Sequence, residues 1–309
     1  MDKPLTRILV WLAIMAVLTL LAMGGWMLAG GDAQSVTSLK WLQGIQTIAT
    51  FLLPAIIGAW LWSPDHRPFR WLKLDQRLTT NNQRLTIIVA LATMILAIPA
   101  INLLADLNSR VVLPECLASL EATLRAQEEA AARLTEQFLQ ADNVGTLLIN
   151  IGLMALLPAL AEEISFRGTL QQIISPSSFH LSFSSYKIHL AIWVTAIVFS
   201  AIHMQFYGFV PRMLMGAMFG YVFVWTGSLW IPILMHATNN SIAVISYFVA
   251  SRSEAGEELL ESNKSWADII GTGPMWWLGV LSLILTLSLL FLLRRQCMQK
   301  DAQGLILND

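Results

Sequence analysis

Residues 145–172 read GTLLINIGLMALLPALAEEISFRGTLQQ. The run is longer than the roughly 20 apolar residues that a helix needs to cross a bilayer. It nevertheless contains two adjacent acids, Glu162 and Glu163, with Arg167 one helical turn further on. A charged side chain at the bilayer centre costs about 2.5–3.5 kcal/mol even on lenient scales, so such residues usually face a cavity or a partner. The stretch predicts a membrane-spanning helix that carries a polar site.

The composition of the whole chain is that of a membrane protein. Of 309 residues, 56% are hydrophobic and only 13% are charged, whereas soluble domains have about 25% charged residues. The net charge of −1 gives no support for a nucleic-acid partner. Cys116 and Cys297 form no metal-binding or disulfide pattern. The apolar run from Ile8 to Gly30 exceeds the roughly 7–15 residues of a signal-peptide core, so we predict a retained first helix.

Apolar runs of spanning length recur along the chain and predict an all-α, polytopic membrane bundle of about eight transmembrane helices. The predicted spans are 8–30, 41–62, 86–106, 145–172, 188–207, 211–228, 230–250 and 275–293.

The distribution of Lys and Arg between the loops predicts the orientation in the membrane. Basic residues flank the first span, fill the loop after the second span and begin the C-terminal tail, whereas the loops at the opposite side are rich in Glu. With eight spans, all the basic segments fall on one side, so both termini are expected to be cytoplasmic. The basic positions are Lys3, Arg7, Arg67, Arg70, Lys73, Arg77, Arg84, Arg294 and Arg295.

The acids of the fourth predicted span differ in what they can reach. Glu163 and Arg167 can form an ion pair within the helix, which lowers the cost of burying either charge. Glu162 is rotated by about 100°, so it can face a cavity. Pro158 removes a backbone donor and is expected to kink the helix just before the acids. The alternative is that the charged pair lies at a helix end, with Arg167 reaching the headgroups.

Two histidines in later spans extend the candidate site. His203 follows the apolar stretch of the fifth predicted span, and His236 and Asn240 share one face of the seventh, four residues apart. Depths estimated at 1.5 Å per residue let Glu162, His203 and His236 meet in one cavity, which we expect to open toward the cytoplasmic half of the membrane.

Taken in order, these residues resemble the motifs of the CAAX-protease and bacteriocin-processing (CPBP, or Abi) family of intramembrane endopeptidases. That family carries a paired-acid EExxxR, an FxxxH and an HxxxN motif. Here they correspond to Glu162–Arg167, Phe199–His203 and His236–Asn240. Each motif is weak alone, and the resemblance lies in the ordered set on separate spans. It covers roughly residues 145–250.

The resemblance implies hydrolysis of a peptide bond in a membrane-associated substrate, of the prenylated CAAX type or related to bacteriocins. Glu162 would be the general base and His203 would help to hold the water, while His236 and Asn240 would donate to the oxyanion. Glu163 and Arg167 would shape and neutralise the site. The expected partners are the peptide or protein substrate and the lipid bilayer, without nucleic acid.

The use of a metal stays open at the level of sequence. Glu162, His203 and His236 could bind a catalytic zinc ion with water as the fourth ligand. The chain has no HExxH motif, and the same residues also suit a glutamate mechanism without metal.

The resemblance also suggests how the chain is organised. We expect transmembrane helices over 1–106, an outer amphipathic helical loop over 107–144, the catalytic core over 145–250, and an outer loop, last transmembrane helix and cytoplasmic tail over 251–309. Leucines at helical spacing predict that residues 113–138 form a helix that covers the bundle.

Two other functions remain compatible with the sequence. A non-catalytic immunity or scaffold protein could keep the same spans. A proton-coupled transporter could also use buried Glu and His, although such transporters often show repeats in matching halves and here the polar residues lie only in the second half.

Overall fold

The computed structural model describes residues 3–75, 83–175, 186–261 and 266–306. In this part of the chain every regular element is a helix and no strand occurs, so the predicted all-α class is confirmed. Within these described ranges, seven helices are long and apolar enough to cross a membrane, and the chain is an integral, multi-pass membrane protein.

Two of the seven spans are compound, because π-helical turns interrupt them. Five spans are built on one helix each. In chain order these helices are α1 (Pro4–Leu28), α5 (Gln83–Ser109), α11 (Phe209–Thr226), α12 (Trp230–Ala250) and α15 (Trp276–Ile306), which form the first, third, fifth, sixth and seventh spans. The second consists of α2 (Val36–Thr47), the π-helical η1 (Ile48–Leu52) and α3 (Leu53–Trp62). The fourth consists of α7 (Val144–Asn150), η3 (Ile151–Leu156), α8 (Leu157–Ser165), η4 (Phe166–Gln171) and α9 (Gln172–Ile174).

An eighth apolar helix, α10 (Tyr186–Ala201), is shorter than the others, with 16 residues. The prediction of a span over 188–207 is therefore wrong at its C-terminal end. The chain turns after Ala201, with Met204 at a φ of 54°, and the hydroxyl of Ser200 donates to the carbonyl of Phe209 at 2.7 Å, closing the turn into α11. Hydropathy alone does not reveal this turn, because Ile202, Met204 and Phe206 continue the apolar run.

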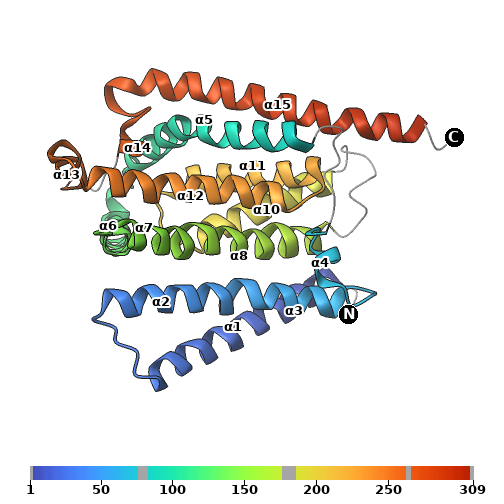
Figure 1. Ribbon diagram of the computed structural model, residues 1–309, viewed down its shortest axis with the longest axis horizontal. Helices are drawn as coiled ribbons and strands as arrows, with labels where there is room; N and C mark the ends of the chain where they lie inside the picture. Colours follow the sequence, from blue (N-terminus) through green and yellow to red (C-terminus); the bar gives the residue numbers. More distant parts are fainter. Residues whose placement is uncertain (1–2, 76–82, 176–185, 262–265, 307–309) are drawn as a thin grey trace.

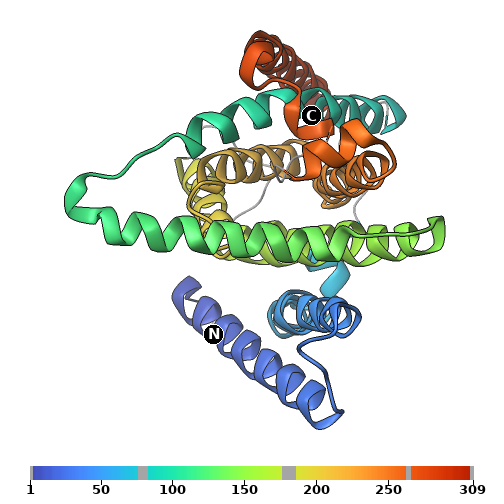
Figure 2. The same ribbon diagram turned by 90° about the vertical axis from the view of Figure 1, so that its left-hand side faces the viewer.

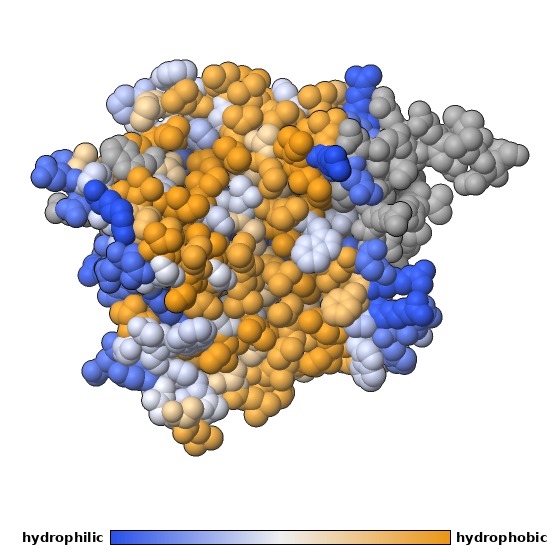
Figure 3. All heavy atoms as spheres, in the orientation of Figure 1, coloured by the Kyte–Doolittle hydropathy of each residue, from blue (hydrophilic) through white to orange (hydrophobic). Residues whose placement is uncertain are grey.

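The helices lie roughly along one direction, with α15 and α5 on one side, α10, α11, α12 and α8 in the middle, and α2, α3 and α1 on the other (Figure 1). The middle layer holds the core residues Phe219, Phe223, Ile231 and Met235. In Figure 3 the surface shows a broad hydrophobic zone between hydrophilic groups at the two ends of the helices. This distribution matches a bundle whose flanks face lipid.

Six further elements complete the described part of the chain. They are α4 (Pro68–Trp71), the 3-10 turns η2 (Glu115–Leu117) and η5 (Gly273–Met275), α6 (Ala118–Leu139), α13 (Glu254–Glu261) and α14 (Trp266–Ile269). The predicted amphipathic helix over 113–138 is confirmed by α6, which lies across one end of the bundle (Figure 2). The start of α1 and the last turns of α15 lie at the opposite end (Figure 1).

Candidate active site

Glu163 is the centre of a buried cluster of polar groups. Its side chain has no exposed area, and its Oε1 accepts from Arg167 Nη1 at 2.7 Å and from His236 Nδ1 at 2.9 Å. The predicted ion pair between Glu163 and Arg167 is thus formed inside the protein and not at the headgroups. The bond between Glu163 and His236 joins the fourth span to α12, which is far away in sequence.

Arg167 is buried as completely as Glu163, and its guanidinium contacts a backbone carbonyl and two aromatic rings as well as Glu163. Its Nη2 donates to the carbonyl of Gly216 on α11 at 2.8 Å. Its guanidinium lies 4.5 Å from the ring centre of Phe199 and 5.5 Å from that of Phe219, within the range of a cation–π contact. The charge is therefore balanced by a carboxylate, a carbonyl and two aromatic faces.

The π-helical turns on either side of α8 determine how the acids are presented. Pro158 stands in the first turn of α8, immediately after η3, which agrees with the expected break before the acids. After the acids, Thr169 Oγ1 donates to the carbonyl of Ile164 at 3.0 Å. Ser165 Oγ donates to the carbonyl of Phe51, in the π-helical turn of the second span, at 2.7 Å. Interruptions of this kind are frequent at functional sites.

Glu162 differs from its neighbour in both partners and exposure. Its side chain keeps 14% of its area exposed, and its Oε2 lies 4.0 Å from Nε2 of His236. The imidazole of His236 thus lies between the two acids, with Nδ1 bonded to Glu163 and Nε2 facing Glu162. Of the two carboxylates, only that of Glu162 has exposed area. Oε2 of Glu163 is buried and has no hydrogen-bond partner among the described residues.

His203 lies in the turn after α10, and its ring orientation is fixed by the backbone. Its Nδ1 is 2.8 Å from the carbonyl of Phe199. Because a carbonyl can only accept, this nitrogen carries the hydrogen, and the neutral ring has its lone pair on Nε2. The ring of Phe199 contacts both His203 and His236, at centroid distances of 5.2 and 6.0 Å.

Asn240 lies one helical turn beyond His236 on α12 and is partly exposed. Its Oδ1 accepts from Asn239 Nδ2 at 3.2 Å. The six predicted residues therefore divide into three groups. Glu162, Glu163, Arg167 and His236 form one cluster, His203 adjoins it through Phe199, and Asn240 shares a helix face with His236.

The position of His203 contradicts one expectation. The loop that carries it contacts α6 and the end of α5: Asn108 Nδ2 donates to the carbonyls of Phe206 and Tyr207, at 3.0 and 2.5 Å, and Tyr207 N donates to Glu128. This is the end of the bundle opposite to the start of α1 (Figure 1). His203 is expected inside the fifth predicted span, but it lies in a loop at this end because α10 ends at Ala201. The direction in which the site opens stays a prediction.

A zinc site at Glu162, His203 and His236 does not fit the geometry. Among the described residues, no group of three or more His, Cys, Asp or Glu side chains is arranged to hold a metal ion. We therefore derive no catalytic step through a metal.

Sequence reasoning missed a fourth charged side chain in this region, that of Arg212 in the first turn of α11. It interacts electrostatically with both Glu162 and His203. The sequence contains a signal that could have identified Arg212, because it is a charged residue within an apolar run, as Glu162 is.

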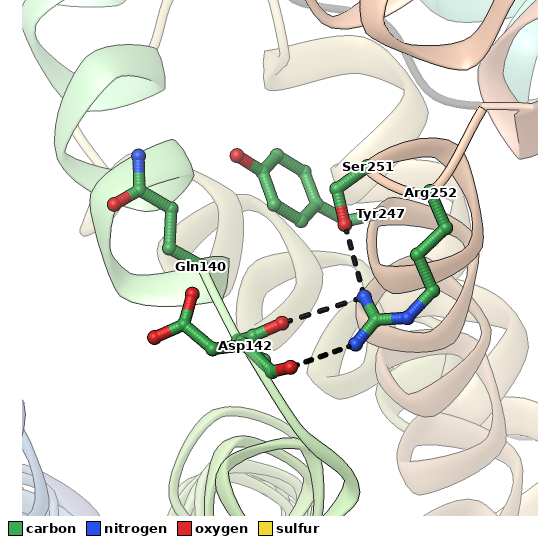
Figure 4. A pocket seen from close by; sticks show the side chains of 6 residues that line it. Gln140, Asp142, Tyr247, Ser251 and Arg252 are labelled. Carbon is green, nitrogen blue, oxygen red and sulfur yellow. Dashed lines mark hydrogen bonds between the residues drawn. The ribbon is translucent and has the colours of Figure 1, made fainter. Parts of the chain in front are cut away.

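A separate pocket of about 370 Å³ lies at the other end of α12 (Figure 4). Its lining includes Arg252, which donates to the carbonyls of Ala141 and Asp142 at 3.5 and 3.1 Å and lies over the ring of Phe248. The guanidinium ties α12 to the segment between α6 and α7. None of the predicted site residues lines this pocket, and its arginine is engaged by the protein itself.

Comparison with known proteins agrees with the motifs. Residues 144–242 match a family described as type II CAAX prenyl endopeptidase Rce1-like. No curated protein and no solved structure gives a significant match to the chain. The matched segment runs from the start of α7 into α12 and contains every predicted site residue, so the resemblance of this part of the chain to the CAAX-protease family is confirmed.

Proposed function

We propose that the protein is an intramembrane endopeptidase in which Glu162 activates a water molecule to hydrolyse a peptide bond. One observation carries this proposal: two adjacent glutamates have different environments. Glu163 is fully buried and bonded to two donors, whereas the side chain of Glu162 keeps 14% of its area exposed and lies beside an imidazole. Adjacent acids in different environments are a common basis for dividing roles in catalysis.

In this mechanism Glu162 takes a proton from water while the water oxygen attacks the carbonyl carbon of the substrate. The lone pair on Nε2 of His203 accepts the second hydrogen of the water and orients it. In its imidazolium form, His236 donates from Nε2 to the developing oxyanion, and the amide of Asn240 is the second donor. Collapse of the tetrahedral intermediate breaks the C–N bond, and the proton held by Glu162 passes to the leaving amine.

Glu163 and Arg167 act on this chemistry through position and charge. Glu163 fixes the ring of His236 by accepting from Nδ1, which directs Nε2 toward Glu162. Arg167 balances the buried charge of Glu163. Neither side chain has an exposed surface on which a substrate could bind.

The substrate class follows from the family and the surroundings of the site. The site is enclosed by helices of spanning length, so the scissile bond must approach from the bilayer or its surface. The family description names a prenylated CAAX substrate, and a lipid-anchored peptide of this type fits a site in a membrane bundle.

The test is hydrolysis of prenylated and other membrane-anchored peptides by the purified protein, with wild type, Glu162→Gln and Glu129→Gln compared in parallel. Removal of a general base lowers rates by about 10²–10⁴-fold, so Glu162→Gln should lose at least about a hundredfold in kcat. Glu129 is an exposed acid of α6 with a side chain 66% exposed, and its replacement should leave kcat unchanged.

A strong chelator is added in a second arm, and the glutamate mechanism predicts no change in rate. Loss of cleavage that zinc restores would overturn the metal-free mechanism. Equal activity of wild type and Glu162→Gln would show that Glu162 is not the general base. Absence of cleavage, combined with proton-coupled uptake in vesicles that depends on Glu162, would favour a transporter.

A further inference from the structure

Arg212 is a cation whose bonding capacity is largely unused. Its Nη2 donates to the amide oxygen of Gln205 at 2.8 Å. Its Nη1 is buried and has no hydrogen-bond partner among the described residues. A buried guanidinium donor without an acceptor is costly, so the position calls for a reason other than stability.

Arg167 provides the comparison within the same site. It is equally charged and lies one helical turn from Glu163, with which it forms an ion pair at 2.7 Å, and its second terminal nitrogen reaches a carbonyl. Arg212 has no ion pair among those found in the described part of the chain, and its one hydrogen-bond acceptor is a neutral amide. Among the described residues, each arginine has one buried nitrogen without a hydrogen-bond partner, Nε in Arg167 and Nη1 in Arg212. The difference is that Arg167 is paired with a carboxylate of the fold and Arg212 is not.

The guanidinium of Arg212, with its unpartnered Nη1, lies in the region of the candidate site. The charge of Arg212 acts on Glu162 and His203, and its guanidinium lies against the loop that carries His203. A Cβ placed on Gly208 would be 3.0 Å from Nη2 and 3.3 Å from Nη1. The absence of a side chain at this position lets the loop close around the guanidinium.

Glu128 of the covering helix α6 is an acid whose charge acts on Arg212, and Gln205 bonds to both side chains. Its Oε1 accepts from Gln205 Nε2 and its Oε2 from Tyr207 N, both at 3.3 Å. These distances exceed the usual 2.7–3.2 Å range, so the contacts are weak. A carboxylate that enters the site can therefore replace Glu128 as the counter-charge of Arg212 at small cost.

We propose that Arg212 binds a carboxylate of the peptide substrate, namely the one at its free C-terminal end, and that Glu128 holds the place of this group in the free protein. The inference rests on the proposed peptide substrate and adds a specificity-determining residue to it. A guanidinium offers two parallel donors that match the two oxygens of a carboxylate. The terminal carboxylate is favoured over a side chain because α6 lies across this end of the bundle (Figure 2), where a chain end enters more readily than the middle of a chain.

The experiment measures binding, so that it does not depend on turnover. Three fluorescent, lipid-anchored peptides of one sequence are compared: one with a free terminal carboxylate, one with a terminal amide, and one with a terminal amide and an Asp in the last position. Their affinities are measured by anisotropy in detergent with Glu162→Gln protein, which binds without cleaving. The same background carries Arg212→Gln, Arg212→Lys, Glu128→Gln and, as the control, Arg133→Gln, an exposed arginine of α6.

The free carboxylate should raise affinity about tenfold or more over the amide, and Arg212→Gln should abolish this difference while leaving binding of the amide unchanged. Arg212→Lys should keep part of the preference, Glu128→Gln should strengthen it and Arg133→Gln should not change it. The thermal unfolding midpoint of each variant shows that it is folded.

Three results would overturn the inference. They are equal affinity for the carboxylate and amide peptides, an equal loss of both on Arg212→Gln, and binding of the Asp peptide as tight as that of the free carboxylate, which would assign Arg212 to a side chain instead. If the carboxylate preference depends on Arg212 but the wild type cleaves none of the peptides, the proposed hydrolysis fails and the binding site stands.

Discussion

Gly216 shows how one residue holds the site together. A methyl group there would lie 3.0 Å from Arg167 Nη2 and 3.1 Å from Phe199 Cδ1, in a region with no free space. We expect Gly216→Ala to lower the free energy of unfolding by about 1–3 kcal/mol, the usual cost of overpacking, and to reduce kcat because it displaces the arginine that pairs with Glu163. Thermal unfolding in detergent and peptide hydrolysis measure the two effects.

The matched control for this variant lies in the same span as the acids. A Cβ on Gly152 would have no heavy atom within 4 Å, so Gly152→Ala should be neutral or slightly stabilising, since alanine restricts the unfolded chain more than glycine. Equal destabilisation by both substitutions would mean that helix geometry, and not the contact with Arg167, explains the effect.

At the scale of the element, α6 is fixed at its N-terminal end by Glu121. The carboxylate accepts from Leu113 N at 2.8 Å and from Arg125 Nε at 2.9 Å. The hydrogen bond from Leu113 and then the one from Arg125 hold the pKa of Glu121 below its usual value. A lowered pKa stabilises the fold above the ordinary pKa of Glu, and this contribution is lost as pH falls through the lowered value.

We therefore expect hydrogen exchange of residues 111–125, corrected for its intrinsic pH dependence, to be faster in Glu121→Gln than in the wild type at neutral pH. The difference should shrink as the carboxylate of the wild type is protonated in acid. A difference that stays constant down to the acid range would show that the charge of Glu121 does not hold the helix.

At the scale of the whole molecule, the arrangement of the helices bears on topology. The start of α1 and the last turns of α15 lie at one end of the bundle, and α6 lies at the other (Figure 1). We expect the end with the termini to be cytoplasmic, as the loop charges predict. Cys116, an exposed residue just before α6, should then react with a membrane-impermeant maleimide added to intact cells that express Cys297→Ala protein.

A membrane-permeant maleimide supplies the reference for complete labelling. Modification of Cys116 only after the cells are opened would reverse the orientation. It would leave the fold unchanged, because the relative positions of the two ends do not depend on which one faces the cytoplasm.

Much of this architecture is readable from local sequence. Hydropathy over some 20 residues predicts the spans because each helix must shield its own backbone from lipid, and the amphipathic spacing of 113–138 predicts α6. The polar residues were found by the same logic, since Glu162, Glu163 and His236 stand out in apolar surroundings. The prediction failed where apolar residues form a turn: the run that includes Ile202 and Met204 reads as helix, but the chain bends there.

The sequence by itself determined an all-α membrane bundle, the positions of its spans to within a few residues and the residue types of its site. Only the tertiary structure decided the rest: that Glu163 bonds to Arg167 and His236 while Glu162 remains open, that His203 lies under α6, and that Arg212 belongs to the same region. The physical reason is that burial cost is a property of each residue and can be read along the chain. Which polar groups satisfy one another depends on contacts between helices, and these are fixed by close packing, such as that of Gly216 against Arg167.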